Sequence, residues 1–362
     1  MRLADCSVPK MTPDCGTRDG QSDGLTFCSV EDGVRSFLSA HAAGKALFVA
    51  DGGSYPMFAP VTAPRAVFAV LDSSDALPLF AMPDEVSCVL AAGGADTLVA
   101  ARVFAAVRGC ACALFPTEAT LDGALCRSTE VNIGGVRGQT ELAPAEVYCD
   151  LARMKSGLAR AYCRLLLTRL ALVEERAVSV LRRRARGENF ENVYGMLLEL
   201  DHSPKSLVSL NARVRRAESD GFPAGEGVTL ARLTGGNLPE WRAFRVLLAL
   251  YRTFFRKGKA RRYFVPDYAA RCALAGAEYG AQEIPTAAEY AHRALALEKF
   301  RAEFVRETDA VVRGREGYLR TLRALAGSYF DETGVCPLKI LPEKVPDGLS
   351  AIIRDFGLME EL

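Results

Sequence analysis

The sequence predicts an α/β half followed by an all-helical half. In the first 150 residues, short apolar runs alternate with segments whose apolar residues follow helical spacing, a pattern typical of a parallel sheet covered by helices. Near Asp150 the period changes, and helical spacing continues to the end of the chain. We therefore expect an irregular, polar arm over residues 1–25, a Rossmann-like domain over 26–152 and a helical domain over 153–362.

Composition excludes several classes of protein. The 362 residues are 49% hydrophobic and 25% charged, as in ordinary globular proteins, and the net charge of +1 argues against a nucleic-acid partner. The first twenty residues lack the apolar core of a secretory signal, and no apolar run is long enough to span a membrane. None of the eleven cysteines forms a CxxC pair, and several lie in apolar runs, where free cysteine is typically buried. We expect a reduced, cytosolic protein.

The expected elements can be placed along the chain. In the first half, helices are expected over 29–43 and after the Gly93-Gly94 pair, an irregular segment after Gly123, and strands over 45–50, 66–71, 79–82, 86–92, 110–115 and 146–149. In the second half, helices are expected over 158–181, 190–200, 206–218, 239–255, 267–277, 286–312, 317–330 and 348–362.

The segment from residue 85 to 123 has the strongest functional signal. An apolar run ends in Gly93-Gly94, a helical stretch follows, and a second apolar run ends in Pro116-Thr117, which together predict one βαβ unit. Paired glycines let a phosphate approach the backbone and meet the N–H groups at the start of a helix. The alternative is that the glycines only make a tight turn.

These residues, with others downstream, resemble a known enzyme superfamily. Besides Gly93 and Gly94, the chain has a basic residue in the following helix (Arg102), the stretch Pro116-Thr117-Glu118-Ala119-Thr120-Leu121-Asp122-Gly123, and Pro144 leading through Val147 to Asp150. Their order and spacing are similar to the polyol-dehydrogenase branch of the iron-containing alcohol dehydrogenases. That branch includes glycerol and sn-glycerol-1-phosphate dehydrogenases, and dehydroquinate synthase shares its fold.

The resemblance implies a fold, a cofactor and site residues. The fold would be dehydroquinate synthase-like, with a cleft between the two domains. NAD or NADP would bind at Gly93, Gly94, Thr117 and Thr120, and Asp122 would contact substrate hydroxyls. For Asp122 the alternative is an Asx turn before glycine. Relatives also hold a divalent metal, through one aspartate and two histidines, which polarises the substrate alcohol.

The chain departs from the family at the metal ligands. Arg160 stands at the best match to the ligand aspartate, and Leu238 at the best match to a ligand histidine. Only three histidines occur in the chain, and none matches the family's spacing: His41, expected at the surface, His202, expected near a helix N-cap, and His292, expected within a helix. In the family an aspartate of the helix normally follows the glycine turn, and this chain has Val99 at that position. We therefore expect no metal site.

Arg160 is expected to replace the metal as a substrate-binding group. It would point into the cleft and form an anion site near Asp122, with Arg102 or with cations of a basic and aromatic cluster over 251–264. The alternative is that Arg160 pairs with a carboxylate such as Asp150 at the domain boundary. The 251–264 cluster itself is more typical of a solvated loop than of a nucleic-acid site. The arginines over 182–186 are expected to close a helix, where cations complement the helix dipole.

Two main functions stay open at this point. One is a divergent NAD(P)-dependent dehydrogenase of glycerol 1-phosphate or another polyol. The other is a non-catalytic relative, a pseudoenzyme, that binds a nucleotide or phosphate ligand; a dehydroquinate synthase-like lyase is a further alternative. In each case the expected partners are a dinucleotide and a small phosphorylated or polyol ligand, without a membrane, and the chain could form a homodimer.

Overall fold

A computed structural model gives the arrangement of most of the first half of the chain and of part of the second. It describes residues 24–41, 43–60, 66–71, 75–181, 188–198, 200, 202–219, 240–241, 244–245, 248, 295 and 298–326. Predictions for the arm before residue 24, for the clusters over 182–186 and 251–264, for His292 and for the helices over 267–277 and 348–362 lie outside the described residues.

The first half contains a six-stranded sheet in which every neighbouring pair is parallel. The strands lie in the order β1-β8-β5-β4-β2-β3. Their bounds are β1 Leu25–Phe27, β2 Lys45–Ala50, β3 Ala66–Val70, β4 Val86–Gly93, β5 Ala111–Pro116 and β8 Glu146–Cys149. Five of the six predicted strands are confirmed, and with them the α/β class. Runs that are apolar at nearly every position suit a sheet that is buried on both faces.

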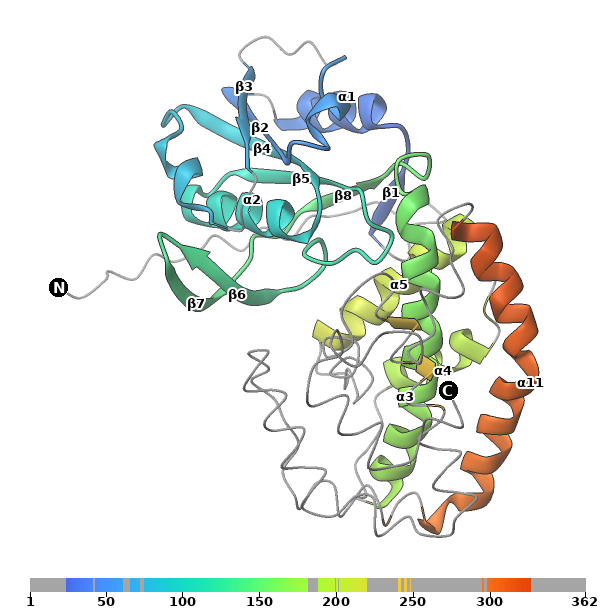
Figure 1. Ribbon diagram of the computed structural model, residues 1–362. Helices are drawn as coiled ribbons and strands as arrows, with labels where there is room; N and C mark the ends of the chain where they lie inside the picture. The colour runs from blue at the N-terminus through green and yellow to red at the C-terminus, as the bar shows by residue number, and fades with distance from the viewer. Residues whose placement is uncertain are drawn as a thin grey trace, which may run out of the picture.

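Alternate residues of the strands pack against helices on opposite faces of the sheet (Figure 1). Helix α1 (Val30–His41) places Val34 and Phe37 in one core cluster with Phe48 of β2. Leu47 and Val49, the neighbours of Phe48, belong to the other cluster, together with α2 (Ala95–Arg108). This period of two is what a pleated strand imposes, so each central strand needs apolar side chains in both directions.

Two features of the first half were missed in the sequence. Strand β1 has three residues and pairs with β8, more than a hundred residues later, so it has no local signal. The segment expected to be irregular contains an antiparallel hairpin of β6 (Ser128–Ile133) and β7 (Val136–Glu141). Its turn is Gly134-Gly135, both with positive φ (61° and 83°), as a two-residue type I′ turn requires.

The predicted strand over 79–82 is wrong. The structure has a short 3-10 helix there, η2 (Leu77–Ala81), with Pro78 in its first turn. Proline lacks the N–H that a strand ladder needs and has the φ that a helical turn needs, so the local backbone preference outweighs the apolar pattern. A similar turn, η1 (Tyr55–Met57), follows β2.

Every described element after Asp150 is helical. These elements are η3 (Lys155–Gly157), α3 (Leu158–Leu181), α4 (Glu188–Leu198), α5 (Pro204–Ser219) and α11 (Arg301–Ala326). The predictions for α3, α4 and α5 are confirmed. The predicted break over 313–316 is wrong, because α11 continues through it. Val311, Leu319 and Leu322 of this helix are buried, and the stabilisation from their packing outweighs the low helix propensity of Gly314 and Gly317.

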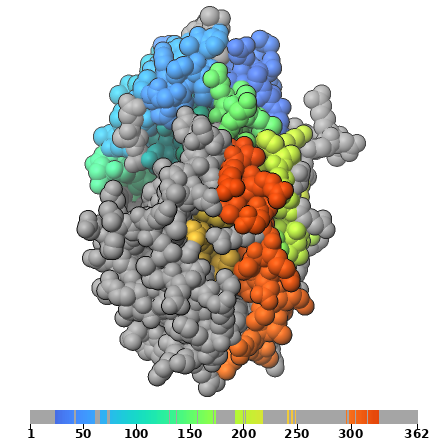
Figure 2. Space-filling model, turned by 45° about the vertical axis from the view of Figure 1, so that its right-hand side comes forward, coloured from blue at the N-terminus to red at the C-terminus, as the bar shows by residue number. Residues whose placement is uncertain are grey.

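The core continues from the sheet into these helices. The cluster on the α2 face of the sheet also includes residues of α3, α4, α5 and α11. In Figure 2 the α/β half forms the upper end of the molecule, and α11 is exposed on the face below it. Among the described helices, none has the length and apolar character that crossing a membrane requires. The domain boundary at residue 152 stays a prediction.

The described cysteines are free thiols. Cys88, Cys112 and Cys163 are buried, as their apolar surroundings in the sequence predicted. Burial raises the pKa of Cys112 to about 12, because a thiolate is poorly stabilised away from water. These thiols therefore stay protonated and unreactive at neutral pH.

Candidate functional site

A crevice opens at the carboxyl ends of the central strands. Its volume is about 570 Å³. Residues that follow four strands line it, together with the first turn of α2 and one side chain of α3. The lining residues are Asp51, Gly52, Gly53, Leu71, Gly94, Ala95, Asp96, Thr97, Glu118, Asp122 and Arg160. After β2 the chain adds β3 on one side, and then returns to add β4, β5 and β8 on the other side. The crevice therefore lies at the point where strand order reverses, the usual ligand site of open parallel sheets.

The glycine turn predicted from the sequence forms one wall of this crevice. Gly93 is buried and has a φ of +149°, and its carbonyl accepts a hydrogen bond from the Thr117 N–H (3.2 Å). Gly94 has an ordinary extended backbone, is the N-cap of α2 and lines the crevice directly. A Cβ added to Gly94 would have its nearest neighbour, Glu118 Oε1, 3.9 Å away, so the space beside Gly94 is open.

The side chain of Asp51 lies against the glycine turn at Gly93-Gly94. Asp51 was not identified as a site residue from the sequence. Its Oδ2 accepts a hydrogen bond from the Gly94 N–H (3.1 Å) and its Oδ1 accepts one from the Ser54 N–H (2.7 Å). A protein carboxylate thus sits beside the first backbone donor that a phosphate would meet at this turn. Asp51 directly follows β2, and this position at a strand end is the signal that could have identified it.

The two glycines are expected to respond differently to substitution. Gly93→Ser should lower the free energy of unfolding by about 2 kcal/mol, because its φ disfavours any side chain and a Cβ would meet Asp51 Oδ2 at 2.4 Å. Gly94→Ser should change it by less than about 0.5 kcal/mol, because serine is a favourable N-cap. Urea denaturation of the two variants checks this. Equal losses would contradict the description of the turn.

The two threonines predicted at the cofactor site lie behind the crevice wall. Thr117 is half-buried and is tied to Gly93 through its backbone. Thr120 is fully buried, and its hydroxyl donates to Asp122 Oδ2 (2.9 Å). Glu118, which the sequence did not single out as a site residue, lines the crevice between them. Cofactor contacts by Thr117 and Thr120 therefore stay predictions.

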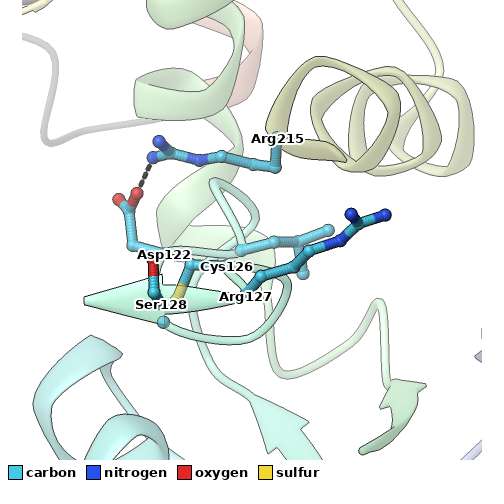
Figure 3. A pocket seen from close by; sticks show the side chains of 7 residues that line it. Asp122, Cys126, Arg127, Ser128 and Arg215 are labelled. Carbon is cyan, nitrogen blue, oxygen red and sulfur yellow. Dashed lines mark ion pairs between the residues drawn. The ribbon is translucent and has the colours of Figure 1, made fainter. Parts of the chain in front are cut away.

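Asp122 connects the crevice to the helices. Its Oδ1 pairs with Arg215 of α5 and lies 3.6 Å from Nη1 of Arg164 of α3, as Figure 3 shows for Arg215. Arg215 also donates from Nε to the Thr120 carbonyl (3.2 Å). Asp122 is predicted to bind substrate; here its carboxylate holds α3 and α5 against the loop after β5. Its side chain is 23% exposed and still lines the crevice.

Arg160 also lines the crevice, but its partners differ from those expected. It donates from Nε to Glu240 Oε1 (2.9 Å) and from Nη1 to Glu118 Oε2 (3.2 Å). Burial alone lowers the pKa of the Arg160 guanidinium, but the charge of Glu240, its hydrogen bond and the charge of Glu118 outweigh burial and raise the pKa above the ordinary value. Arg160 therefore stays a cation.

Two expected partners of Arg160 are elsewhere. Arg102 is buried and donates to the carbonyls of Ala143 (2.9 Å) and Gly123 (3.0 Å), so the expectation that it joins an anion site in the cleft is wrong. Asp150 accepts instead from the Ala152 N–H (3.0 Å). Among the described residues, the partners of Arg102 are backbone oxygens and the Cys126 thiol.

The residues that the sequence resemblance matches to metal ligands do not suit a divalent ion. Arg160, at the place of the ligand aspartate, lies against Glu240, two residues after Leu238 in the sequence. The pair brings together the two segments that the resemblance matched to ligand segments. The Arg160 guanidinium lies between the carboxylates of Glu240 and Glu118, and Glu118 belongs to the loop after β5. Within the described ranges, no group of three or more His, Cys, Asp or Glu side chains could hold a metal.

The two described histidines have structural surroundings. His41 Nε2 lies 3.1 Å from Glu146 Oε1, and its ring packs against Phe37 of α1. The ring of His202 packs edge-on against Tyr162 at 5.3 Å. The next residue, Ser203, caps α5 through its hydroxyl, which accepts from the Ser206 N–H (3.3 Å). The prediction that His202 lies in a helix N-cap region is confirmed.

Comparison with known proteins gives likenesses of fold. No family model matches this sequence, and no curated protein does. Among solved structures, the chain is similar to a probable glycerol dehydrogenase from Sinorhizobium meliloti (15% identity, 76% of this chain and 96% of that one, TM-score 0.48). It is also similar to maleylacetate reductase from Agrobacterium tumefaciens (15% identity, 93% of this chain and 94% of that one, TM-score 0.42). A third similar structure is 2-deoxy-scyllo-inosose synthase complexed with NAD+ and Co2+ (14% identity, 74% of this chain and 83% of that one, TM-score 0.43).

Proposed function

We propose that this protein binds a nucleotide, of the NAD or NADP type, in the crevice between β2 and β4, and that it does not carry out metal-dependent alcohol oxidation. It would be a divergent, non-catalytic relative of the dehydroquinate synthase-like polyol dehydrogenases. The observation that carries this proposal is the hydrogen bond from Arg160 to Glu240, at the place where such an enzyme needs a metal.

The crevice supports the nucleotide part of the proposal. It lies where strand order reverses, and Gly52, Gly53 and Gly94 present bare backbone to it. Asp51 stands at the end of β2, and each of its carboxylate oxygens keeps acceptor capacity beyond its one backbone hydrogen bond. A carboxylate at a strand end suits the hydroxyls of a ribose, which need acceptors. A bound NAD would supply hydride chemistry. Asp51 would bind and orient its ribose.

The charge of the crevice limits where a diphosphate can lie. Four carboxylates line it (Asp51, Asp96, Glu118 and Asp122), against the single guanidinium of Arg160. Like charges oppose a phosphate at the start of α2, although the backbone N–H groups of that turn attract one. We therefore expect the affinity for phosphate-bearing nucleotides to be moderate.

The Arg160 pair supports the non-catalytic part. A metal lowers the pKa of a bound alcohol as a Lewis acid, so that hydride can leave. A guanidinium donates hydrogen bonds but has no vacant orbital, and the raised pKa of Arg160 keeps it from acting as a base. Binding can persist at such a site after the chemistry has been lost.

Blocking the crevice at Gly94 tests the nucleotide site. Gly94→Val should weaken NADH binding at least tenfold, because its side chain projects into open space that the ligand would need. The matched control is Gly138→Val, on β7, where a Cβ meets nothing within 4 Å and which does not line this crevice. Fluorescence titration of NADH measures both. Equal binding by the two variants, or none by the unchanged protein, would overturn the proposed site.

A further inference from the structure

Helix α11 packs on the core with one side and presents charged side chains to solvent with another. Val311, Leu319 and Leu322 are buried in the core that α11 shares with α3. The helix lies at the outer edge of the helical half (Figure 1), and Figure 2 shows its surface exposed. The exposed charged residues of this helix include Arg306, Asp309, Arg313, Glu316, Arg320 and Arg323.

The charges of this exposed face follow a repeat of seven residues. Arg306, Arg313 and Arg320 form one row, and Asp309 and Glu316, each three positions after an arginine, form the row beside it. Since seven residues make nearly two helical turns, each row stays on one side of the helix. Positive and negative charges therefore alternate along the exposed face over about four turns.

Small residues lie next to these rows with the same repeat. Ala310, Gly317 and Ala324 are seven residues apart, and Gly317 and Ala324 are exposed. A Cβ added to Gly317 would meet nothing within 4 Å, so the space beside it is open. Glycine lowers the stability of a helix, but it lets a second helix approach closely.

We infer that this face of α11 binds the same face of a second copy of the chain, with the two helices antiparallel about a two-fold axis. An axis that passes between positions 314 and 315 places Arg313 against Glu316 of the partner subunit. The same axis places Asp309 against Arg320 of the partner subunit, so both pairs fit one register. A two-fold interface uses the same surface twice, and each ion pair therefore forms twice.

Charge complementarity decides both the occupant and the orientation. A parallel pair of these helices about a two-fold axis would set each row against itself, and like charges would face one another. In the antiparallel pair, only Arg306 and Arg323, at the two ends, oppose a like charge, and Arg306 lies 4.0 Å from Glu307. A nucleic acid or an anionic membrane would meet the carboxylates of the acidic row.

Salt should weaken this association, because exposed ion pairs are screened. In sedimentation equilibrium of the full chain without nucleotide, we expect a dimer with a dissociation constant in the micromolar range at about 50 mM NaCl. At about 500 mM NaCl the association should be at least tenfold weaker. A chain that stays monomeric at about 100 µM and low salt would overturn the inference.

Charge reversal at the centre of the interface tests the pairing. Arg313→Glu sets a carboxylate against Glu316 of the partner subunit at two places, so it should weaken dimerisation at least tenfold. The double variant Arg313→Glu, Glu316→Arg restores both pairs with exchanged signs and should dimerise like the unchanged chain. Arg35→Glu, at an exposed position of α1, is the matched control and should leave dimerisation unchanged.

The double variant also separates this inference from pairing within α11. Positions 309 and 313 are four residues apart, as are 316 and 320, so the natural charges could stabilise the helix alone. In the double variant both of these spacings carry like charges, so pairing within the helix predicts a lower melting temperature and no recovery of dimerisation. That result would contradict the inference, and so would a dimer that Arg313→Glu and Arg35→Glu affect equally. Circular dichroism shows that each variant folds. The outcome is independent of NADH binding.

Discussion

Replacing Asp122 with alanine is expected to lower the free energy of unfolding by about 3 kcal/mol. Arg164 and Arg215 are 10% and 17% exposed and both lie against this carboxylate, and removing one member of a largely buried charge group is strongly destabilising. The change also removes the nearer of the two carboxylate acceptors of the buried Thr120 hydroxyl. Chemical denaturation of the variant measures the loss.

A surface pair provides the control for Asp122. Asp84 pairs with Arg108, and its side chain is 90% exposed, so Asp84→Ala should cost less than about 1 kcal/mol. If Asp122→Ala were no more harmful than Asp84→Ala, Asp122 would not hold α3 and α5 to the loop after β5. Its predicted role in binding substrate would then be the better explanation of its position.

Replacing Arg160 with methionine should also cost about 3 kcal/mol, because it leaves Glu240 without its cation. The Glu240 side chain is only 5% exposed, so water cannot replace the guanidinium. The double variant Arg160→Met, Glu240→Leu should recover most of this loss, since a well-packed apolar pair can substitute for a buried ion pair. Thermal and urea denaturation of the three variants complete the cycle.

An exposed arginine tests whether the Arg160 effect is specific. Arg35 has a side chain that is 77% exposed and pairs with Asp32 on the surface of α1, so Arg35→Met should be neutral within about 0.5 kcal/mol. A double variant no more stable than Arg160→Met would mean that Glu240 is not the group that Arg160 neutralises. The ion pair would then not explain why an arginine stands at this position.

The fold of the first half could be predicted because its signals are local. Central strands such as β2 and β4 are apolar at nearly every position, and glycines mark their ends. The hairpin was missed because its strands are largely polar, and one of its faces meets solvent. Only the adjacent glycines at 134 and 135 indicated its turn. Strand β1 depends on a partner far away in the sequence, so no local pattern could predict it.

The site could be predicted in part. The crevice at Gly94 follows from a strand, a glycine turn and a helix, all close in sequence. Asp51 could have been identified from its position directly after β2. Glu240 could not, because it lies 80 residues from Arg160, and only the packing of the helical half brings the two together.

The most direct test of the central claim is a calorimetric titration of NADH with EDTA present, repeated with Zn2+ in place of EDTA. The crevice residues bind the nucleotide and Arg160 occupies the place of the metal, so we expect one NADH per chain and the same dissociation constant in both titrations. Binding that occurs only with Zn2+, together with zinc-dependent reduction of NAD+ by glycerol, would contradict the account.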